Sequence, residues 1–233
     1  MFTAVYHAVI YNPLLNLLVL FYNFIPDVGV VIILVTGLIR LALAPSFHKS
    51  LKSQAAMNAI QPKMSEIREK HKNDQQAQAA AMMALYKEHK INPFSSCLPL
   101  IIQLPILIAL YQVFNTALKN HIEGLYSFIH APESISPLFL NWLDLSKPSW
   151  ALGVVAGLAQ FWQSKLMMPK NKGAQDSTAK IMSMQTTYVL PVISVVIALK
   201  LPAGLPLYWI VTTLFGVAQQ YWINRRRELA NTA

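Results

Sequence analysis

The sequence predicts an all-α integral membrane protein with five transmembrane helices, and three observations support this fold class. Of its 233 residues, 55% are hydrophobic and 12% are charged, whereas roughly 25% of the residues of a soluble domain are charged. Five apolar stretches approach or reach the length of a membrane span. The basic residues gather between these stretches, as the positive-inside rule describes. The net charge of +9 therefore needs no nucleic-acid partner to explain it.

The predicted elements follow the chain in order. The spans are expected at 28–45, 93–118, 150–168, 182–200 and 202–224. Residues 1–27 mix Leu and Val with Tyr, His and Asn, which favours an extracytoplasmic interfacial helix over a sixth span. At 1.5 Å per residue the shortest apolar run covers about 25 Å, less than a hydrocarbon core of about 30 Å. Local thinning of the bilayer is therefore expected.

The connecting segments set the predicted orientation. Residues 46–92 are strongly basic, and apolar residues recur there at spacings of three and four on both sides of Asn73 and Asp74. This pattern predicts a cytoplasmic helical hairpin, with a kink or break at Pro62. The remaining segments are an extracytoplasmic loop at 119–149, a cytoplasmic loop at 169–181 and a cytoplasmic tail at 225–233. The N-terminus is thus expected outside and the C-terminus in the cytoplasm.

Arg40 stands inside an apolar run, where a bare guanidinium costs about 2.5 kcal/mol on insertion scales. Thr36 lies four residues earlier on the same helical face, and further polar or amphipathic residues of the spans include Gln103, Gln163 and Trp209. Two interpretations remain open. Arg40 snorkels to the cytoplasmic headgroups, or Arg40 and Gln163 line a water-filled hollow that opens to the cytoplasm. The second favours attraction of acidic or polar peptide segments.

Catalytic motifs are missing from the sequence. It contains no G-x-S-x-G, no H-E-x-x-H and no glycine-rich phosphate loop. All six histidines fall outside the predicted spans, and no Asp or Glu lies within them. Cys97 is the single cysteine, which excludes an intrachain disulfide. We therefore expect no enzyme, no metal and no cofactor.

Several blocks carry a resemblance to a known family. They read "GVVIILVTGLIRLALAP", "IQPKMSEIREK", "MMALYKEHKINPFSSCLPLIIQLPILIALYQVF" and "LPAGLPLYWIVTTLFGVAQQYWINRR". In these blocks, and in their order, the chain resembles the YidC insertases of bacteria with their mitochondrial Oxa and chloroplast Alb relatives. The resemblance implies a five-span core in the bacterial cell membrane, with a hydrophilic groove that is open to the cytoplasm and lipid, closed on the outside, and accompanied by a mobile cytoplasmic hairpin.

The resemblance also implies a function. A protein of this kind moves hydrophilic parts of nascent membrane proteins partway across the bilayer, while their apolar segments pass into lipid. It does so alone or with the Sec translocon. The implied partners are nascent membrane proteins, the bilayer, the Sec translocon, the ribosome and the signal recognition particle receptor.

Residue by residue, the resemblance places Arg40 on the family's groove arginine, Thr36 on its polar neighbour, Gln163 on a groove position and Trp209 on an aromatic position. Thr213 departs from the family, because many relatives carry Asn there. The short tail after Arg227 leaves strong ribosome binding open. A solute or ion carrier and a structural membrane subunit remain the alternatives, although the chain lacks the internal repeats typical of carriers.

Overall fold

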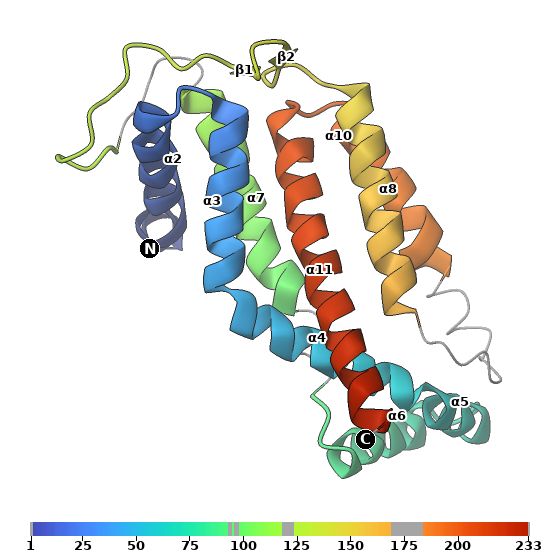
Figure 1. Cartoon of the computed structure of the whole chain (residues 1–233). Coiled ribbons are helices and arrows are strands. Elements are labelled where there is room, and N and C mark those ends of the chain that lie inside the picture. The colour runs from blue at the N-terminus through green and yellow to red at the C-terminus, as the bar shows by residue number, and fades with distance from the viewer. Residues whose placement is uncertain (1, 93–94, 96–97, 118–123, 169–183, 233) are drawn as a thin grey trace.

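The computed structural model describes residues 2–92, 95, 98–117, 124–168 and 184–232. These residues are mostly helical, with turns and short loops between the helices and one short β-hairpin (Figure 1). The all-α class is therefore confirmed. The predicted cytoplasmic loop at 169–181 lies outside the described residues.

The long helices form a bundle whose members run alongside one another (Figure 1). They are α3 (Val28–Ala42), α7 (Leu98–Ala117), α8 (Trp150–Met167), α10 (Leu190–Ala198, after the π-helical turn η3, Gln185–Val189) and α11 (Gly204–Thr232). The α11 helix packs against α3, α7 and α8, and α10 packs against α8. The apolar core includes Leu15, Val31, Val35 and Leu205, each no more than 1% exposed. Apolar burial between helices thus holds α11 near the middle of the bundle.

Side-chain caps fix where two bundle helices begin. The Asp27 carboxylate accepts hydrogen bonds from the backbone N–H groups of Gly29 and Val30, at 2.9 and 3.0 Å. The Ser149 hydroxyl accepts one from the Leu152 N–H at 3.4 Å. These bonds satisfy donors that the first turn of a helix otherwise leaves without partners. Both caps lie at the end of the bundle that carries the β-hairpin, here called the β end (Figure 1).

The chain bends sharply after α3. Its helix ends at Ala42, three residues before the predicted end of the span at residue 45, and α4 (Ala44–Ala59) leaves at an angle of 67°. Pro45 lies in the first turn of α4, where its missing N–H costs no hydrogen bond. The bend therefore redirects the chain away from the bundle axis without breaking helical structure for more than one residue.

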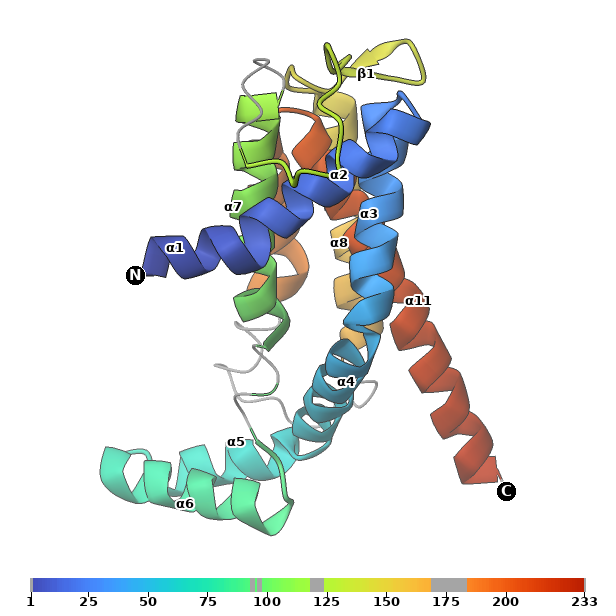
Figure 2. The ribbon, with the colours of Figure 1, turned by 90° about the vertical axis from the view of Figure 1, so that its left-hand side faces the viewer.

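The N-terminal helices α1 (Phe2–Tyr6), η1 (His7–Tyr11) and α2 (Asn12–Phe24) run obliquely across the bundle (Figure 2). Polar side chains of α2 attach the loop that precedes the β-hairpin. Asn16 donates to the Gly124 carbonyl at 2.9 Å and accepts from the Tyr126 N–H at 2.7 Å. Tyr22 accepts from the Ser136 N–H at 2.8 Å. The loop is consequently tied to α2 along its length.

Beyond α4, the helices α5 (Gln61–Lys70) and α6 (Gln75–Glu88) lie side by side, away from the bundle (Figure 2). A small apolar cluster of Ile60, Met64 and Leu85 joins them, separately from the main core. Pro62 stands in the first turn of α5, so the helix is interrupted just before Pro62 and a new helix begins. The Asp74 carboxylate caps α6 by accepting from the Ala77 N–H at 2.9 Å.

Small residues bring α8 and α10 close together. A Cβ atom at Gly157 would overlap the Cγ2 methyl of Val195, and one at Gly153 would lie 3.2 Å from the Cβ of Ala198. Glycines spaced by four are typical of close helix contacts in membranes. Beside them, the Ser194 hydroxyl donates to Gln160 Oε1 at 2.6 Å, and both residues are buried.

Length and apolar composition give a separate criterion for membrane spans. Among the described residues, the stretch Thr3–Phe24 passes by itself, and α3 with α4 passes when the bent pair is taken as one span. Ile101–Thr116 and Thr187–Ala198 are apolar but shorter. The number of five spans stays a prediction under this criterion.

Candidate functional site

Arg40 lies in the last turn of α3 and is 8% exposed. Its Nε donates a hydrogen bond to the Thr212 hydroxyl of α11 at 2.8 Å. The guanidinium carbon stands 4.1 Å from the centroid of the Phe47 ring of α4. A hydrogen bond and a cation–π contact therefore hold the arginine between three helices.

The bend between α3 and α4 explains the aromatic contact. Phe47 follows Arg40 by seven residues, and a straight helix would place the two side chains two turns apart. The turn of 67° after Ala42 instead brings the Phe47 ring against the guanidinium. Cation–π contacts contribute about 0.5 to 2 kcal/mol, more when the pair is shielded from water.

Among the described residues, no carboxylate forms an ion pair with Arg40. Thr212 and Phe47 orient the guanidinium but carry no negative charge. The positive charge of Arg40 thus remains uncompensated by any described side chain. A buried cation in this state attracts anions more strongly than a surface lysine does, because the local dielectric constant is lower.

Two further polar side chains reach α11 on either side of Thr212. Gln103 of α7 donates from Nε2 to the Tyr208 hydroxyl at 2.7 Å, and Tyr208 is 3% exposed. Gln163 of α8 lies against Gly216, because a Cβ atom at Gly216 would overlap its Nε2. Gly216 therefore leaves the space that the Gln163 amide occupies.

These contacts share one face of α11. Tyr208, Thr212 and Gly216 are spaced by four residues, which places them in one row along the helix. We call this row the α11 ridge. Gln103, Arg40 and Gln163 reach it from three different helices. The structure thus brings three of the five predicted site residues to one row.

The other two predicted site residues lie beside the ridge. Thr36 is 2% exposed and stands one turn before Arg40 on α3. Trp209 is half-buried and follows Tyr208 directly, so it is rotated by about 100° from the ridge. Thr36 and Trp209 are thus close in sequence to residues of these contacts, but neither is part of the α11 ridge.

Sequence reasoning did not single out Phe47, Tyr208 or Gly216 as site residues. Tyr208 and Gly216 had a usable signal, since each is four residues from Thr212, a polar residue within the predicted span 202–224. Phe47 had none, because its approach to Arg40 depends on the direction of the bend.

Known proteins provide an independent comparison. The profile of a family described as "60Kd inner membrane protein" matches residues 20–230. The chain belongs to this family. A membrane protein insertase YidC of Geotalea uraniireducens is 40% identical over 217 residues, which are 92% of this chain and 37% of that protein. A second, from Geobacter sulfurreducens, is 38% identical over 221 residues, which are 94% of this chain and 38% of the relative. The chain thus spans less than two-fifths of the length of these family members.

A solved structure of the family agrees with the fold. It is described as an active YidC insertase crystal structure with the first transmembrane domain resolved, and it superposes with a TM-score of 0.63 at 28% sequence identity. The superposition covers 93% of this chain and 46% of that chain. The resemblance to YidC insertases drawn from the sequence blocks is confirmed.

Proposed function

We propose that this chain is an insertase core that moves hydrophilic segments of nascent membrane proteins partway across the bilayer and releases their apolar helices into lipid. The observation that carries the proposal is Arg40, a buried cation without a described carboxylate partner. The insertase names of relatives that are about 40% identical support it. No covalent chemistry is required, so the proposed activity is not enzymatic.

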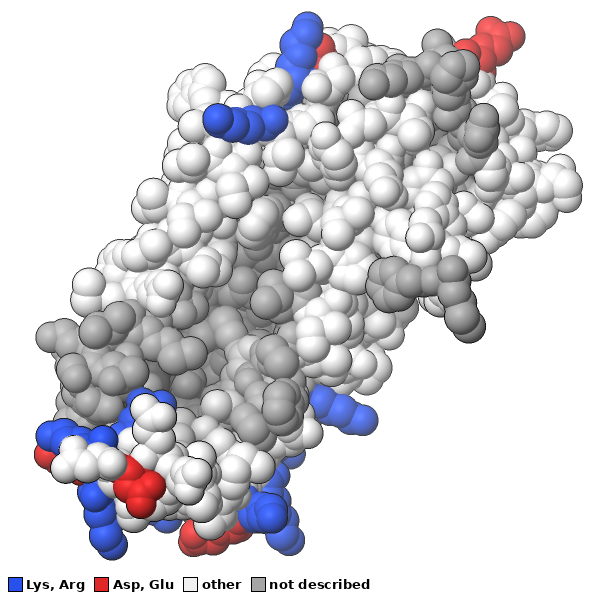
Figure 3. All heavy atoms as spheres, turned by 180° about the vertical axis from the view of Figure 1, so that it is seen from behind, with Lys and Arg blue, Asp and Glu red and all other residues white. Residues whose placement is uncertain are grey.

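The surface of the molecule supports a membrane position. Lys, Arg, Asp and Glu gather toward the two ends of the face seen in Figure 3, and the described residues visible between them are mostly uncharged. In the proposed arrangement α3, α7, α8, η3 with α10, and α11 are the five spans. The β end faces outward, whereas α5, α6 and the end of α11 lie in the cytoplasm. The bonds of α2 to the loop before the β-hairpin support an outer position for the N-terminal helices.

Arg40 acts in this proposal as an electrostatic attraction point within a hydrophilic groove. The groove opens toward the cytoplasm and lipid and is closed at the β end. Thr36, Gln103, Gln163 and Trp209 supply its polar and amphipathic lining. An acidic segment about 4 Å from Arg40 gains a Coulomb energy of about 4 kcal/mol at an effective dielectric constant near 20. Desolvation of both charges offsets part of this energy.

The proposed partners follow from the same mechanism. Nascent membrane proteins are the clients, and the bilayer receives their apolar helices. The Sec translocon, the ribosome and the signal recognition particle receptor are proposed to deliver clients, with α5 and α6, which lie away from the bundle, as the surface that meets them (Figure 2). Insertion into liposomes that contain only this protein separates the activity of the chain from that of the Sec translocon.

Paired clients test the role of Arg40. The two clients are identical except for an acidic or a neutral translocated tail, and each is inserted into liposomes at matched protein levels. We expect Arg40→Lys to retain insertion, whereas Arg40→Gln and Arg40→Ala reduce it by one to two powers of ten for the acidic client. Arg225→Ala is the matched control, because Arg225 is exposed on α11. Equal insertion of both clients by the wild-type and Arg40→Ala proteins would favour snorkelling and overturn the proposal.

Single cysteines test the proposed orientation. In a Cys97→Ser background, cysteines at Ser65 and Asn231 should resist an impermeant reagent added to intact cells, because both positions are cytoplasmic in the proposed topology. They should react after the membrane is opened. Labelling of both positions from outside would reject the orientation.

A further inference from the structure

Large apolar side chains project from the β end. Trp142 and Trp150 are each 73% exposed, Phe24 is 77% exposed and Leu140 is 57% exposed. They come from three separate parts of the chain, namely the end of α2, the β-hairpin and the start of α8. Side chains of this size are rarely left in water together without a partner. Their common position indicates a shared apolar environment.

The hairpin that carries Leu140 and Trp142 has an unusual turn. Strands β1 (Leu138–Phe139) and β2 (Leu143–Asp144) pair in antiparallel register, with Phe139 opposite Leu143. Leu140 and Asn141 have φ angles of 52° and 62°, in the left-handed region that residues other than Gly, Asn and Asp seldom adopt. A leucine in this conformation needs support from its surroundings.

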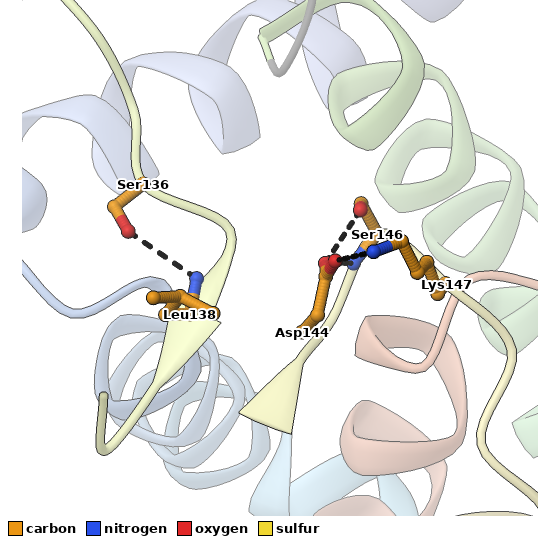
Figure 4. Close-up of polar contacts among 5 residues, drawn as sticks. All are labelled: Ser136, Leu138, Asp144, Ser146 and Lys147. Atoms are coloured by element: carbon orange, nitrogen blue, oxygen red, sulfur yellow. Dashed lines mark hydrogen bonds and ion pairs between the residues drawn. The ribbon is translucent and has the colours of Figure 1, made fainter. Parts of the chain in front are cut away.

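Two sets of polar contacts supply that support. The Asp27 carboxylate accepts from the Leu140 N–H at 2.7 Å through its second oxygen. At the base of the hairpin, Asp144 accepts from the Ser146 N–H at 3.0 Å and pairs with Lys147 at 2.9 Å (Figure 4). The turn is thereby fixed to the start of α3 and to the segment before α8. These contacts therefore fix the orientation of the apolar tip relative to the bundle.

We propose that the tip of the β-hairpin, Leu140 with Trp142, inserts into the headgroup region of the outer leaflet, with Trp150 at the same level. The occupant of this surface is the lipid interface. Tryptophan prefers that environment, because its ring is apolar and its N–H still finds polar partners.

The neighbouring charge fits the same partner. The Lys147 side chain is 77% exposed and pairs with Asp144. In the proposed placement it lies at the level of the lipid phosphates. A lysine next to exposed tryptophans is the usual pattern of an anchor at a membrane boundary. The contact fixes the depth of the β end in the bilayer, and it does not depend on insertase activity.

Fluorescent labelling tests the contact directly. The probe NBD is attached to a single cysteine at Trp142→Cys in a Cys97→Ser background, and the protein is reconstituted in phosphatidylcholine vesicles. The matched control carries the probe at Glu133→Cys, an exposed polar position in the loop before the hairpin. Leu140→Cys provides a second tip position, in case the first variant fails to fold.

At the tip positions we expect a blue-shifted emission and at least twofold stronger quenching by lipids spin-labelled near the headgroup than at the control. Lipids labelled at the end of the acyl chain should quench the tip weakly. Emission typical of water at both tip positions would overturn the proposal. So would a blue shift without quenching by either lipid, since it would place the tip against protein.

Discussion

Replacing Asp27 separates two structural roles of one carboxylate. Its first oxygen caps α3 by accepting from the Gly29 and Val30 N–H groups, and its second accepts from the Leu140 N–H. Serine keeps one side-chain oxygen for the cap but has none for the hairpin. Alanine has neither. Asp27→Ser therefore removes the hairpin link alone, and Asp27→Ala removes the cap as well.

The expected losses follow from these contacts. A hydrogen bond to a charged group contributes about 1.5 to 3 kcal/mol, so Asp27→Ser should lower the free energy of unfolding by about 2 kcal/mol. Loss of an N-cap costs about 1 kcal/mol, so Asp27→Ala should lower it by about 3 kcal/mol. Ser149→Ala removes only a long cap bond on α8 and should cost no more than about 1 kcal/mol.

Reversible unfolding in micelles measures these differences, and hydrogen exchange at the Leu140 amide identifies the broken link. We expect faster exchange there in both Asp27 variants and unchanged exchange in Ser149→Ala. The reasoning would be refuted if Asp27→Ser unfolded like the wild type, or if the Leu140 amide remained protected in Asp27→Ala.

Three further predictions concern other parts of the molecule. Gly157→Ala should destabilise the α8–α10 contact by about 1 kcal/mol net, since overpacking costs about 1 to 3 kcal/mol and helix propensity returns about 1 kcal/mol; adding Val195→Ala should recover the loss in the same unfolding assay. Hydrogen bonds from Ser146, followed by the contact with Lys147, lower the pKa of the Asp144 carboxyl. They therefore stabilise the hairpin above about pH 4, and this contribution is lost as the pH falls through the lowered pKa. Amide hydrogen exchange of the hairpin relative to that of the bundle helices should become faster as the pH falls through this range, and Asp144→Asn should abolish this pH dependence. Amides of residues 73–78 should exchange rapidly, because this segment joins two weakly packed helices, and strong protection there would contradict a flexible arm.

Periodicity and local chemistry predicted much of the helical structure. Asp74 caps α6 at the point where the sequence pattern separates the two predicted helices of the hairpin, and α8 ends one residue before the predicted boundary at 168. Such features depend on neighbours in the chain. Caps, prolines and apolar spacing therefore carry enough information to locate a helix.

Contacts between helices were harder to predict. The pairs Arg40–Thr212 and Gln103–Tyr208 depend on the rotation and the axial shift of one helix relative to another. A single sequence gives the spacing along each helix but neither of those quantities. The ring of Phe47 reaches Arg40 only through the direction of the bend at Leu43. The polar side chains Arg40, Gln103 and Gln163 could thus be named from the sequence, but the residues that they contact could not.

The α11 ridge gives the site a scale of depth. Each step of four residues rises about 6 Å along a helix, so Arg40 meets the ridge about 6 Å from the level of Tyr208 and about 6 Å from the level of Gly216. The contacts with the α11 ridge therefore set the positions of α3, α7 and α8 along the axis of α11. A shift of α11 along its axis would carry Thr212 away from the arginine and would disturb the neighbouring contacts at the same time. The height of the charge in the membrane is consequently set by α11 as much as by the helix that bears Arg40.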